Sequence, residues 1–202
     1  MPTPDVEAWA AWRPDELAAR LEGWLVPWAV AAGWALDLWL GGEPREHEDL
    51  EVAIARESFP AVRAAFPELE WFGAGGLEGV EETLWPVDLA PGEVHQTWGW
   101  DAAEGCWRVD VFREPWAGDT WVCRRDAAVR LPLVNAIERT PDGIPFLRPE
   151  IVLLFKAKHV REKDVADFDR ALPRLELQRR RWLAEALRVV HPGHAWIERL
   201  EA

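Results

Sequence analysis

Two acidic residues, Asp49 and Glu51, stand two positions apart in the alternating segment Asp49-Leu-Glu-Val-Ala-Ile54. The alternation of acidic and apolar residues predicts a strand, on which residues i and i+2 project to the same side, roughly 6–7 Å apart at the backbone. Leu50 and Val52 would then face the core. Two carboxylates aimed at one spot repel each other unless cations hold them. The pair therefore suits two Mg²⁺ ions roughly 3.5–4 Å apart, which can bind both the attacking and the leaving oxygens of a phosphoryl displacement.

A third carboxylate, Asp110, lies in Trp107-Arg-Val-Asp-Val-Phe112, a mostly apolar segment that predicts a second strand. On a strand adjacent to the first, Asp110 would complete the metal site or accept the proton of an attacking hydroxyl. The alternative is that Asp49 and Glu51 face solvent on an edge strand while Asp110 pairs with an arginine, because acidic and apolar residues often alternate in half-buried strands. The residues alone leave both interpretations open.

A longer pattern surrounds the first acidic pair. Ala32-Gly-Trp-Ala-Leu-Asp-Leu-Trp-Leu-Gly41, followed by Arg45-Glu-His-Glu-Asp-Leu-Glu51, resembles the polymerase-beta-type nucleotidyltransferases, and most closely the aminoglycoside and lincosamide nucleotidyltransferases. That family shows Gly-Gly-Trp-Ala-hydrophobic-Asp and then Arg-x-His-x-Asp-hydrophobic-Asp. Ala32 replaces the first glycine here, and we expect it to fit at a negative φ. Glu51 replaces the second aspartate and is a metal ligand with a longer reach. Asp37 also matches, and we expect it to be structural, bonding to the polar loop that follows.

The resemblance implies roles for residues on both sides of this loop. Asp49, Glu51 and Asp110 would bind the two Mg²⁺ ions, and Asp110 would also be the general base. The nucleotide phosphates would approach the start of a helix at Gly33 and Trp34, where backbone N–H groups and the helix dipole favour anions. The nucleotide-binding residues that the resemblance implies are Gly33, Trp34, Arg45, His47, Lys156 and Lys158.

Four of these are basic, and each has an alternative interpretation. By resemblance, Arg45 and His47 orient the loop before the metal strand or touch phosphate, but a solvated polar loop would have the same composition. Lys156 and Lys158 belong to a helix predicted over residues 150–160, where an ammonium would stabilise charge on departing pyrophosphate. A basic cluster on a helix is also typical of a solvated face. The sequence does not separate the two lysines.

Composition excludes several classes of protein. The chain has 202 residues, 49% of them hydrophobic, and a formal net charge of −13. An acidic surface repels nucleic acid and attracts cationic ligands, although it also serves solubility. No apolar run is long enough to span a membrane and no signal-peptide pattern is present, so we expect a cytoplasmic protein. Without an export signal, Cys106 and Cys123 are expected to be buried free thiols.

The elements that must position these residues predict an α+β fold: a mixed-sheet nucleotidyltransferase core flanked by helices over residues 14–135, and a helical C-terminal cap over 149–202. Residues 1–13 are expected to be a loosely ordered lead, and Gly73-Ala-Gly-Gly76 a turn. The remaining expected helices cover residues 14–24, 34–40, 58–66, 150–160, 164–172, 175–190 and 192–202. The expected strands cover residues 28–32, 49–54, 70–72, 83–89, 107–112 and 120–123.

The function that these features predict is Mg²⁺-dependent transfer of a nucleoside monophosphate from a nucleoside triphosphate to a hydroxyl of a small molecule, with release of pyrophosphate. The acidic surface and the resemblance together favour a cationic acceptor such as an aminoglycoside. Two alternatives remain: transfer to a protein hydroxyl, as in toxin–antitoxin nucleotidyltransferases, and a catalytically inactive nucleotide-binding module. The acceptor, the preferred triphosphate and the oligomeric state are not encoded in any motif.

Overall fold

The computed structural model describes residues 4–75, 83–90 and 94–202 and forms two compact units. Unit 1 combines the described residues of Met1–Val30 and Glu46–Pro115, and unit 2 combines Ala31–Arg45 with Trp116–Ala202. Unit 2 therefore includes residues 31–45 and 116–135, which the sequence had assigned to the core. The functional division into core and cap stays a prediction.

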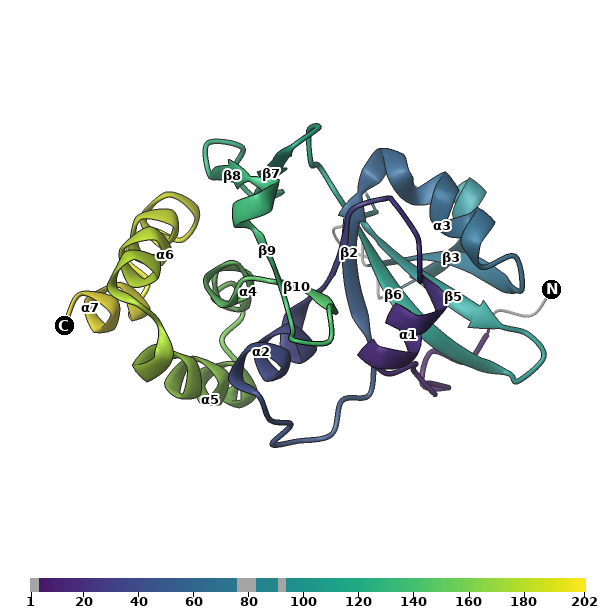
Figure 1. The fold of residues 1–202 in the computed structure, drawn as a ribbon, viewed down its shortest axis with the longest axis horizontal. Helices are drawn as coiled ribbons and strands as arrows, with labels where there is room; N and C mark the ends of the chain where they lie inside the picture. Colours follow the sequence, from purple (N-terminus) through teal and green to yellow (C-terminus); the bar gives the residue numbers. More distant parts are fainter. Residues whose placement is uncertain (1–3, 76–82, 91–93) are drawn as a thin grey trace. The chain divides into compact units, whose positions relative to one another are not determined.

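Unit 1 is built on a mixed sheet (Figure 1). Its described strands follow the order β4-β3-β5-β6-β2-β1. The pair β2–β6 is parallel, whereas the other neighbouring pairs are antiparallel. The predicted α+β fold with a mixed sheet is confirmed. The strands are β1 (Trp28–Val30), β2 (Glu51–Ala55), β3 (Leu69–Gly75), β4 (Thr83–Pro86), β5 (Gln96–Asp101) and β6 (Cys106–Glu114).

Two helices pack apolar side chains against this sheet. Helix α1 (Pro14–Arg20) begins with proline at its first position, and the Glu16 carboxylate accepts a 2.7 Å hydrogen bond from the Arg13 backbone N–H. Helix α3 (Phe59–Ala65) follows β2 through a short 3₁₀ turn, Arg56–Ser58. The buried core of unit 1 includes Leu17, Leu21, Val52, Ile54, Val62, Phe66, Trp71, Val109 and Val111.

The N-terminal lead is more ordered than expected. Trp9 forms a parallel bridge with Trp107 of β6, and the Trp107 N–H donates to the Ala8 carbonyl oxygen at 2.8 Å. The Trp12 N–H donates to the Arg108 carbonyl oxygen at 3.0 Å. The expectation of a loose lead is wrong for the described residues, because backbone pairing along β6 fixes them, a contact that helical or strand periodicity does not reveal.

The predicted glycine turn is also wrong. Gly73 and Gly75 both belong to β3, while Gly76 lies outside the described residues. A Cβ atom on Gly73 would come within 2.6 Å of the Ala90 Cβ. The glycine therefore permits close packing within a strand instead of a change of chain direction.

Unit 2 is mainly helical. Helix α2 (Ala32–Leu40) ends at Gly41, whose φ of 75° lies in the left-handed region typical of a helix end. Helix α4 (Pro149–Lys156) packs against α2 and against the two helices that follow it, α5 (Glu162–Ala171) and α6 (Leu177–Val190). The Ile151, Leu153 and Leu154 side chains of α4 are fully buried. The other elements are β7 (Thr120–Val122), β8 (Arg130–Pro132), β9 (Ile137–Arg139), β10 (Pro145–Leu147) and α7 (Trp196–Glu201).

Two further expectations concern cysteines and membranes. Cys106 and Cys123 are buried free thiols, as expected. In the part of the chain that the structure describes, no helix combines the length and the apolar character needed to cross a membrane.

Candidate active site

The three predicted acids lie on or next to β2 and β6, which run side by side in unit 1. Glu51 lies opposite Asp110 in the parallel register. The Asp110 N–H donates to the Leu50 carbonyl oxygen at 2.8 Å, so the pairing extends one residue before β2. Asp49 precedes that bond, and the prediction that Asp49 and Glu51 share one strand is wrong in this detail, because the ladder begins at Leu50. The charge of Asp49 still lies near enough to raise the pKa of Asp110.

The Asp110 carboxylate accepts a side-chain hydrogen bond on one of its two oxygens. Asp110 is 2% exposed. Gln96, on the neighbouring strand β5, donates a hydrogen bond from Nε2 to Asp110 Oδ2 at 2.8 Å. The other carboxylate oxygen, Oδ1, is buried and has no hydrogen-bond partner among the described residues. An unsatisfied buried oxygen costs free energy, so such atoms commonly mark a place where an ion, water or ligand binds. The protein fixes one Asp110 oxygen and leaves the second available.

The protonation of Asp110 is also unusual. Burial raises the pKa of this carboxyl to about 7, with the Gln96 hydrogen bond opposing the rise and the charge of Asp49 adding to it. An ordinary exposed aspartate has a pKa of about 4 and is fully ionised at neutral pH. A general base works best when its pKa lies near the working pH. In this environment Asp110 can both lose and gain a proton near neutrality.

The acids fit magnesium in the kind of ligand they offer, because Mg²⁺ prefers carboxylate oxygens. The unsatisfied Oδ1 of Asp110 and the nearby charge of Asp49 are features that a cation would stabilise. However, within residues 4–75, 83–90 and 94–202, no three or more His, Cys, Asp or Glu side chains are gathered closely enough to hold a metal ion. A metal role for Asp49, Glu51 and Asp110 is therefore a proposal that rests on ligand chemistry.

The predicted phosphate segment opens helix α2 in unit 2. Gly33 and Trp34 are both buried in its first turn. Ala32, the first residue of the helix, has a φ of 47°, so the expectation of a negative φ is wrong. In the left-handed region the Cβ approaches the following carbonyl oxygen, which costs roughly 1–2 kcal/mol for a residue other than glycine. The backbone of the segment is strained at the position where the resembling family has glycine.

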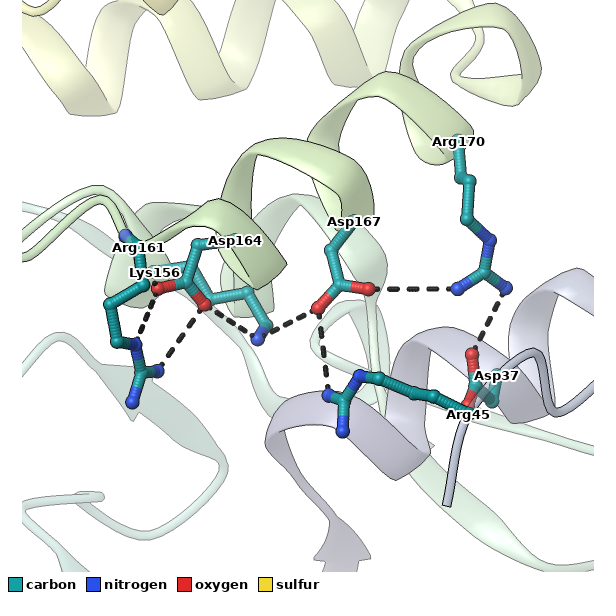
Figure 2. Close-up of polar contacts among 7 residues, drawn as sticks. All are labelled: Asp37, Arg45, Lys156, Arg161, Asp164, Asp167 and Arg170. Atoms are coloured by element: carbon teal, nitrogen blue, oxygen red, sulfur yellow. Dashed lines mark hydrogen bonds and ion pairs between the residues drawn. The ribbon is translucent and has the colours of Figure 1, made fainter. Parts of the chain in front are cut away.

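A cluster of buried ion pairs joins helices α4 and α5 of unit 2 (Figure 2). Lys156 Nζ lies 2.9 Å from Asp164 Oδ1 and 2.9 Å from Asp167 Oδ2. The lysine side chain is 8% exposed, and the two carboxylates are 1% and 4% exposed. Arg161 donates to Asp164 Oδ2 from its Nε at 2.8 Å and from its backbone N–H at 3.2 Å. Although burial alone would raise the pKa of Asp164, the bonds from Arg161 and Lys156 lower it to about 2.

Asp167 extends this cluster to two arginines. Arg45 Nη2 lies 3.9 Å from Asp167 Oδ2, and Arg170 Nη1 lies 3.5 Å from Asp167 Oδ1. Arg170 Nη2 also donates to Asp37 Oδ1 at 3.0 Å, which ties α2 to α5. Asp37 is thus held by Arg170 of α5, whereas its expected bond to the loop of residues 45–48 stays a prediction. The Asp167 and Asp37 carboxylates are buried, whereas the Arg45 side chain is 35% exposed.

The remaining predicted residues differ in exposure. Lys158 is exposed, two residues after the nearly buried Lys156. His47 is half-buried in the segment that follows Arg45. The nucleotide-binding roles of these residues, and of Gly33 and Trp34, stay predictions.

The sequence contains a signal for the ion-pair cluster that the motif-based interpretation missed. The pattern Arg161-x-x-Asp164-x-x-Asp167-x-x-Arg170 repeats every three residues, a spacing that places neighbours on one face of a helix. Gln96 was also missed, because strand β5 was not predicted. The available sign of a strand was that Gln96, Trp98 and Trp100 fall at every second residue, the spacing of side chains on one face of a strand.

Comparison with known proteins bears on the fold and on one segment of the sequence. Residues 15–74 match a family model described as aminoglycoside-2''-adenylyltransferase. No curated protein sequence matches the chain. Three solved structures have a similar fold with TM-scores above 0.5, and the residues of this chain that they cover include both units.

The solution structure of the antibiotic-resistance factor ANT(2'')-Ia is 16% identical, with 92% of each chain covered and a TM-score of 0.55. The lincomycin-bound crystal structure of the lincosamide antibiotic adenylyltransferase LnuA is 15% identical, covers 76% of this chain and 90% of its own, and gives a TM-score of 0.51. The crystal structure of ANT(2'')-Ia with adenylyl-2''-tobramycin is 13% identical, covers 85% and 93%, and also gives 0.51. At these identities the likeness is one of fold.

Proposed function

We infer that this chain, a relative of the aminoglycoside and lincosamide nucleotidyltransferases by the match of residues 15–74 and by its fold, is a nucleotidyltransferase that acts on a small hydroxylated molecule. The donor is a nucleoside triphosphate, and the reaction requires Mg²⁺. The observation that carries the proposal is the environment of Asp110. It lies in register with Glu51, one of its oxygens accepts a hydrogen bond from Gln96, and its other oxygen is buried without a described partner.

In the proposed reaction, the acceptor hydroxyl oxygen bonds to the α-phosphorus of the triphosphate. The bond from the α-phosphorus to the oxygen bridging to the β-phosphate breaks, and pyrophosphate leaves with that oxygen. Asp110 accepts the hydroxyl proton, which its pKa of about 7 suits. Gln96 holds Asp110 Oδ2, so that Oδ1 is the oxygen available to the acceptor or to a cation.

Asp49, Glu51 and Asp110 would hold magnesium. When bound there, Mg²⁺ would supply charge stabilisation to the phosphoryl oxygens. Gly33 and Trp34 at the start of α2 would offer backbone N–H groups to phosphate. The proposed positive partners are Arg45, His47 and one of the two lysines, Lys156 or Lys158.

The acceptor that we propose is a cationic, hydroxylated antibiotic of the aminoglycoside type. Two observations support this choice. The net charge of −13 favours a cationic ligand over an anionic one. The related folds include ANT(2'')-Ia in complex with adenylyl-2''-tobramycin and the lincosamide antibiotic adenylyltransferase LnuA with lincomycin bound.

A pyrophosphate-release assay tests the proposal directly. Each of four nucleoside triphosphates is combined with Mg²⁺ and with a panel of aminoglycosides, lincosamides and neutral polyols. We expect release with at least one aminoglycoside, none in EDTA, and a rate that falls with added salt because screening weakens the attraction of a cationic acceptor.

The controls separate the parts of the proposal. Activity on neutral acceptors alone would contradict the cationic acceptor but not the enzyme class. Binding of triphosphate without turnover on any acceptor, including the proteins of a cell lysate, would indicate an inactive nucleotide-binding module. Turnover in EDTA would contradict the metal requirement.

A further inference from the structure

Asp167 stands at the junction of the ion-pair cluster in unit 2 (Figure 2). One of its oxygens, Oδ2, lies 2.9 Å from Lys156 Nζ and 3.9 Å from Arg45 Nη2. Its other oxygen, Oδ1, lies 3.5 Å from Arg170 Nη1. Its side chain is 4% exposed, so a single buried negative charge is shared by three cations that come from α4, α5 and the loop after α2.

The cations around Asp167 are not held equally. Lys156 also bonds to Asp164 at 2.9 Å, and Arg170 also bonds to Asp37 at 3.0 Å. Arg45 has the longest contact with Asp167 and the most exposed side chain of the three, at 35%. If the charge of Asp167 were removed, the three cations would repel one another. Arg45 could move away most easily, because its contact with Asp167 is the longest and its side chain is the most exposed.

We propose that Asp167 is a positioning residue for triphosphate binding, acting through Arg45 and Lys156. The inference rests on the proposed function, which assigns Arg45 and one of the two lysines, Lys156 or Lys158, to the nucleotide, and it selects Lys156. Asp167 does not touch the ligand. Its buried charge holds the guanidinium and the ammonium at fixed places, so that neither has to be ordered when the triphosphate arrives.

Charge and position predict opposite outcomes when Asp167 is neutralised. If the carboxylate acted only as a nearby negative charge, its removal would strengthen the binding of a polyanion. If it positions Arg45 and Lys156, its removal weakens binding, because charge-assisted contacts to phosphate depend on geometry. The sign of the change therefore discriminates between the two explanations.

The chain offers a matched control on the same helix. Asp169 also pairs with an arginine, Arg199, at 2.8 Å, but both side chains are about half exposed, at 51% and 46%. Asp169→Asn makes the same change in net charge as Asp167→Asn, two residues along α5, outside the buried cluster. Asp167→Glu keeps the charge and changes its reach.

The experiment is isothermal titration of the full chain with the Mg²⁺ complexes of four nucleoside triphosphates and of inorganic tripolyphosphate. For a ligand that the wild type binds, we expect Asp167→Asn to raise Kd by about tenfold, a loss typical of one hydrogen bond to a charged group. Asp169→Asn should change Kd by less than about twofold, as expected for a surface ion pair. Asp167→Glu should restore part of the affinity.

A double-mutant cycle identifies the route. If Asp167 acts through Arg45, the loss from Arg45→Met and the loss from Asp167→Asn should not add in the double variant, because the second change removes an already lost contact. Fully additive losses, or an Asp167→Asn Kd equal to or below that of the wild type, would overturn the inference. A thermal melt of each variant checks folding, and a lower Tm with unchanged Kd would likewise make Asp167 purely structural.

Failure of the inference and failure of the proposed function are distinguishable. If the wild type binds no triphosphate, the proposed function is wrong and the inference falls with it. If the wild type binds and turns over triphosphate while Asp167→Asn binds equally well, the inference alone is overturned.

Discussion

Asp110 in unit 1 and Asp164 in unit 2 are both almost fully buried, at 2% and 0% exposed, yet their pKa values move in opposite directions. Burial raises the pKa of Asp110 to about 7, opposed by a hydrogen bond from the neutral amide of Gln96 and increased by the charge of Asp49. Burial also acts on Asp164, but there Arg161 and Lys156 lower the pKa to about 2. The difference is that cationic side chains contact Asp164, whereas the side chain that bonds to Asp110 is a neutral amide.

In unit 2 the protein provides its own cations for Asp164, namely Arg161 and Lys156. In unit 1 the described contacts of Asp110 include no cation, so its charge is compensated poorly until a proton or another positive ligand arrives. The two aspartates are equally buried, so burial does not distinguish their environments, whereas the direction of the pKa shift does. This is why a perturbed carboxyl in a poorly compensated site is a functional candidate, whereas a perturbed carboxyl in an ion-pair cluster is a structural one.

The largest expected effect is on turnover. Asp110→Asn keeps the shape of the side chain but cannot accept a proton, so we expect the rate to fall by roughly 10²–10⁴, the usual value of general-base assistance. Nucleotide affinity should change little, because Asp49 and Glu51 remain. Asp49→Asn should instead reduce both affinity and rate. One titration and one rate per variant measure the contrast, and near-normal turnover of Asp110→Asn would place the base elsewhere.

The next effect is on the stability of unit 2. Asp164→Asn removes the buried carboxylate that Lys156 and Arg161 share, and Lys156 keeps Asp167. We therefore expect the free energy of unfolding to fall by roughly 3–5 kcal/mol, as when one member of a buried ion pair is removed. Urea denaturation measures it. The exposed pair of Asp169 gives the control, since Asp169→Asn should cost at most about 1 kcal/mol. Equal losses in the two variants would remove the distinction between buried and surface pairs.

The pH dependence of stability should separate the two aspartates further. The folded pKa of Asp110 is raised, so its stabilising contribution is full below about pH 4 and is lost as pH rises towards 7, by up to about 1.4 kcal/mol per pH unit for one proton. The folded pKa of Asp164 is lowered, so its contribution is present above about pH 4 and is lost as pH falls towards 2.

Metal-free wild type and Asp110→Asn should therefore differ in slope between pH 4 and 7, with the variant flatter. Addition of Mg²⁺ should reduce the wild-type decline, because a ligand that binds only the folded protein stabilises it. Denaturant midpoints across the pH range measure both effects. Parallel curves for the two proteins would show that Asp110 does not titrate in this range.

The smallest expected effect concerns the backbone of unit 2. Ala32→Gly removes the Cβ at a φ of 47°, and we expect it to raise the free energy of unfolding by about 1 kcal/mol. A gain would show that the backbone conformation of Ala32 destabilises the folded protein and that removing its Cβ relieves this strain. A loss of stability would mean that glycine's greater freedom in the unfolded chain outweighs the strain. Ala35→Gly, at a regular position of the same helix, is the control and should destabilise.

Much of the fold was predictable because local patterns dominate it. Pro14 and the acidic residues after it mark the start of α1, and Gly41 marks the end of α2 at a positive φ. The three candidate acids were predicted from spacing and from a family resemblance, and their role stays a prediction. Gln96 and the role of Asp167 were not predicted, because both depend on contacts between residues far apart in the sequence. The φ of Ala32 was missed for a similar reason, since tertiary packing can impose a conformation that local preference disfavours.

The backbone pairing of residues 8–12 with β6 has a consequence for how this protein is handled. Trp9 bridges Trp107, whereas β2 pairs with β6 from Asp110 onward. The N-terminal segment therefore satisfies donors and acceptors of β6 that β2 does not reach. Cutting the chain before Arg13 would leave a bare strand edge beside a cluster of tryptophans, the kind of surface that recruits other chains into aggregates or exchanged dimers. An affinity tag is accordingly better placed after Ala202, and an N-terminal tag needs a spacer that leaves this segment intact.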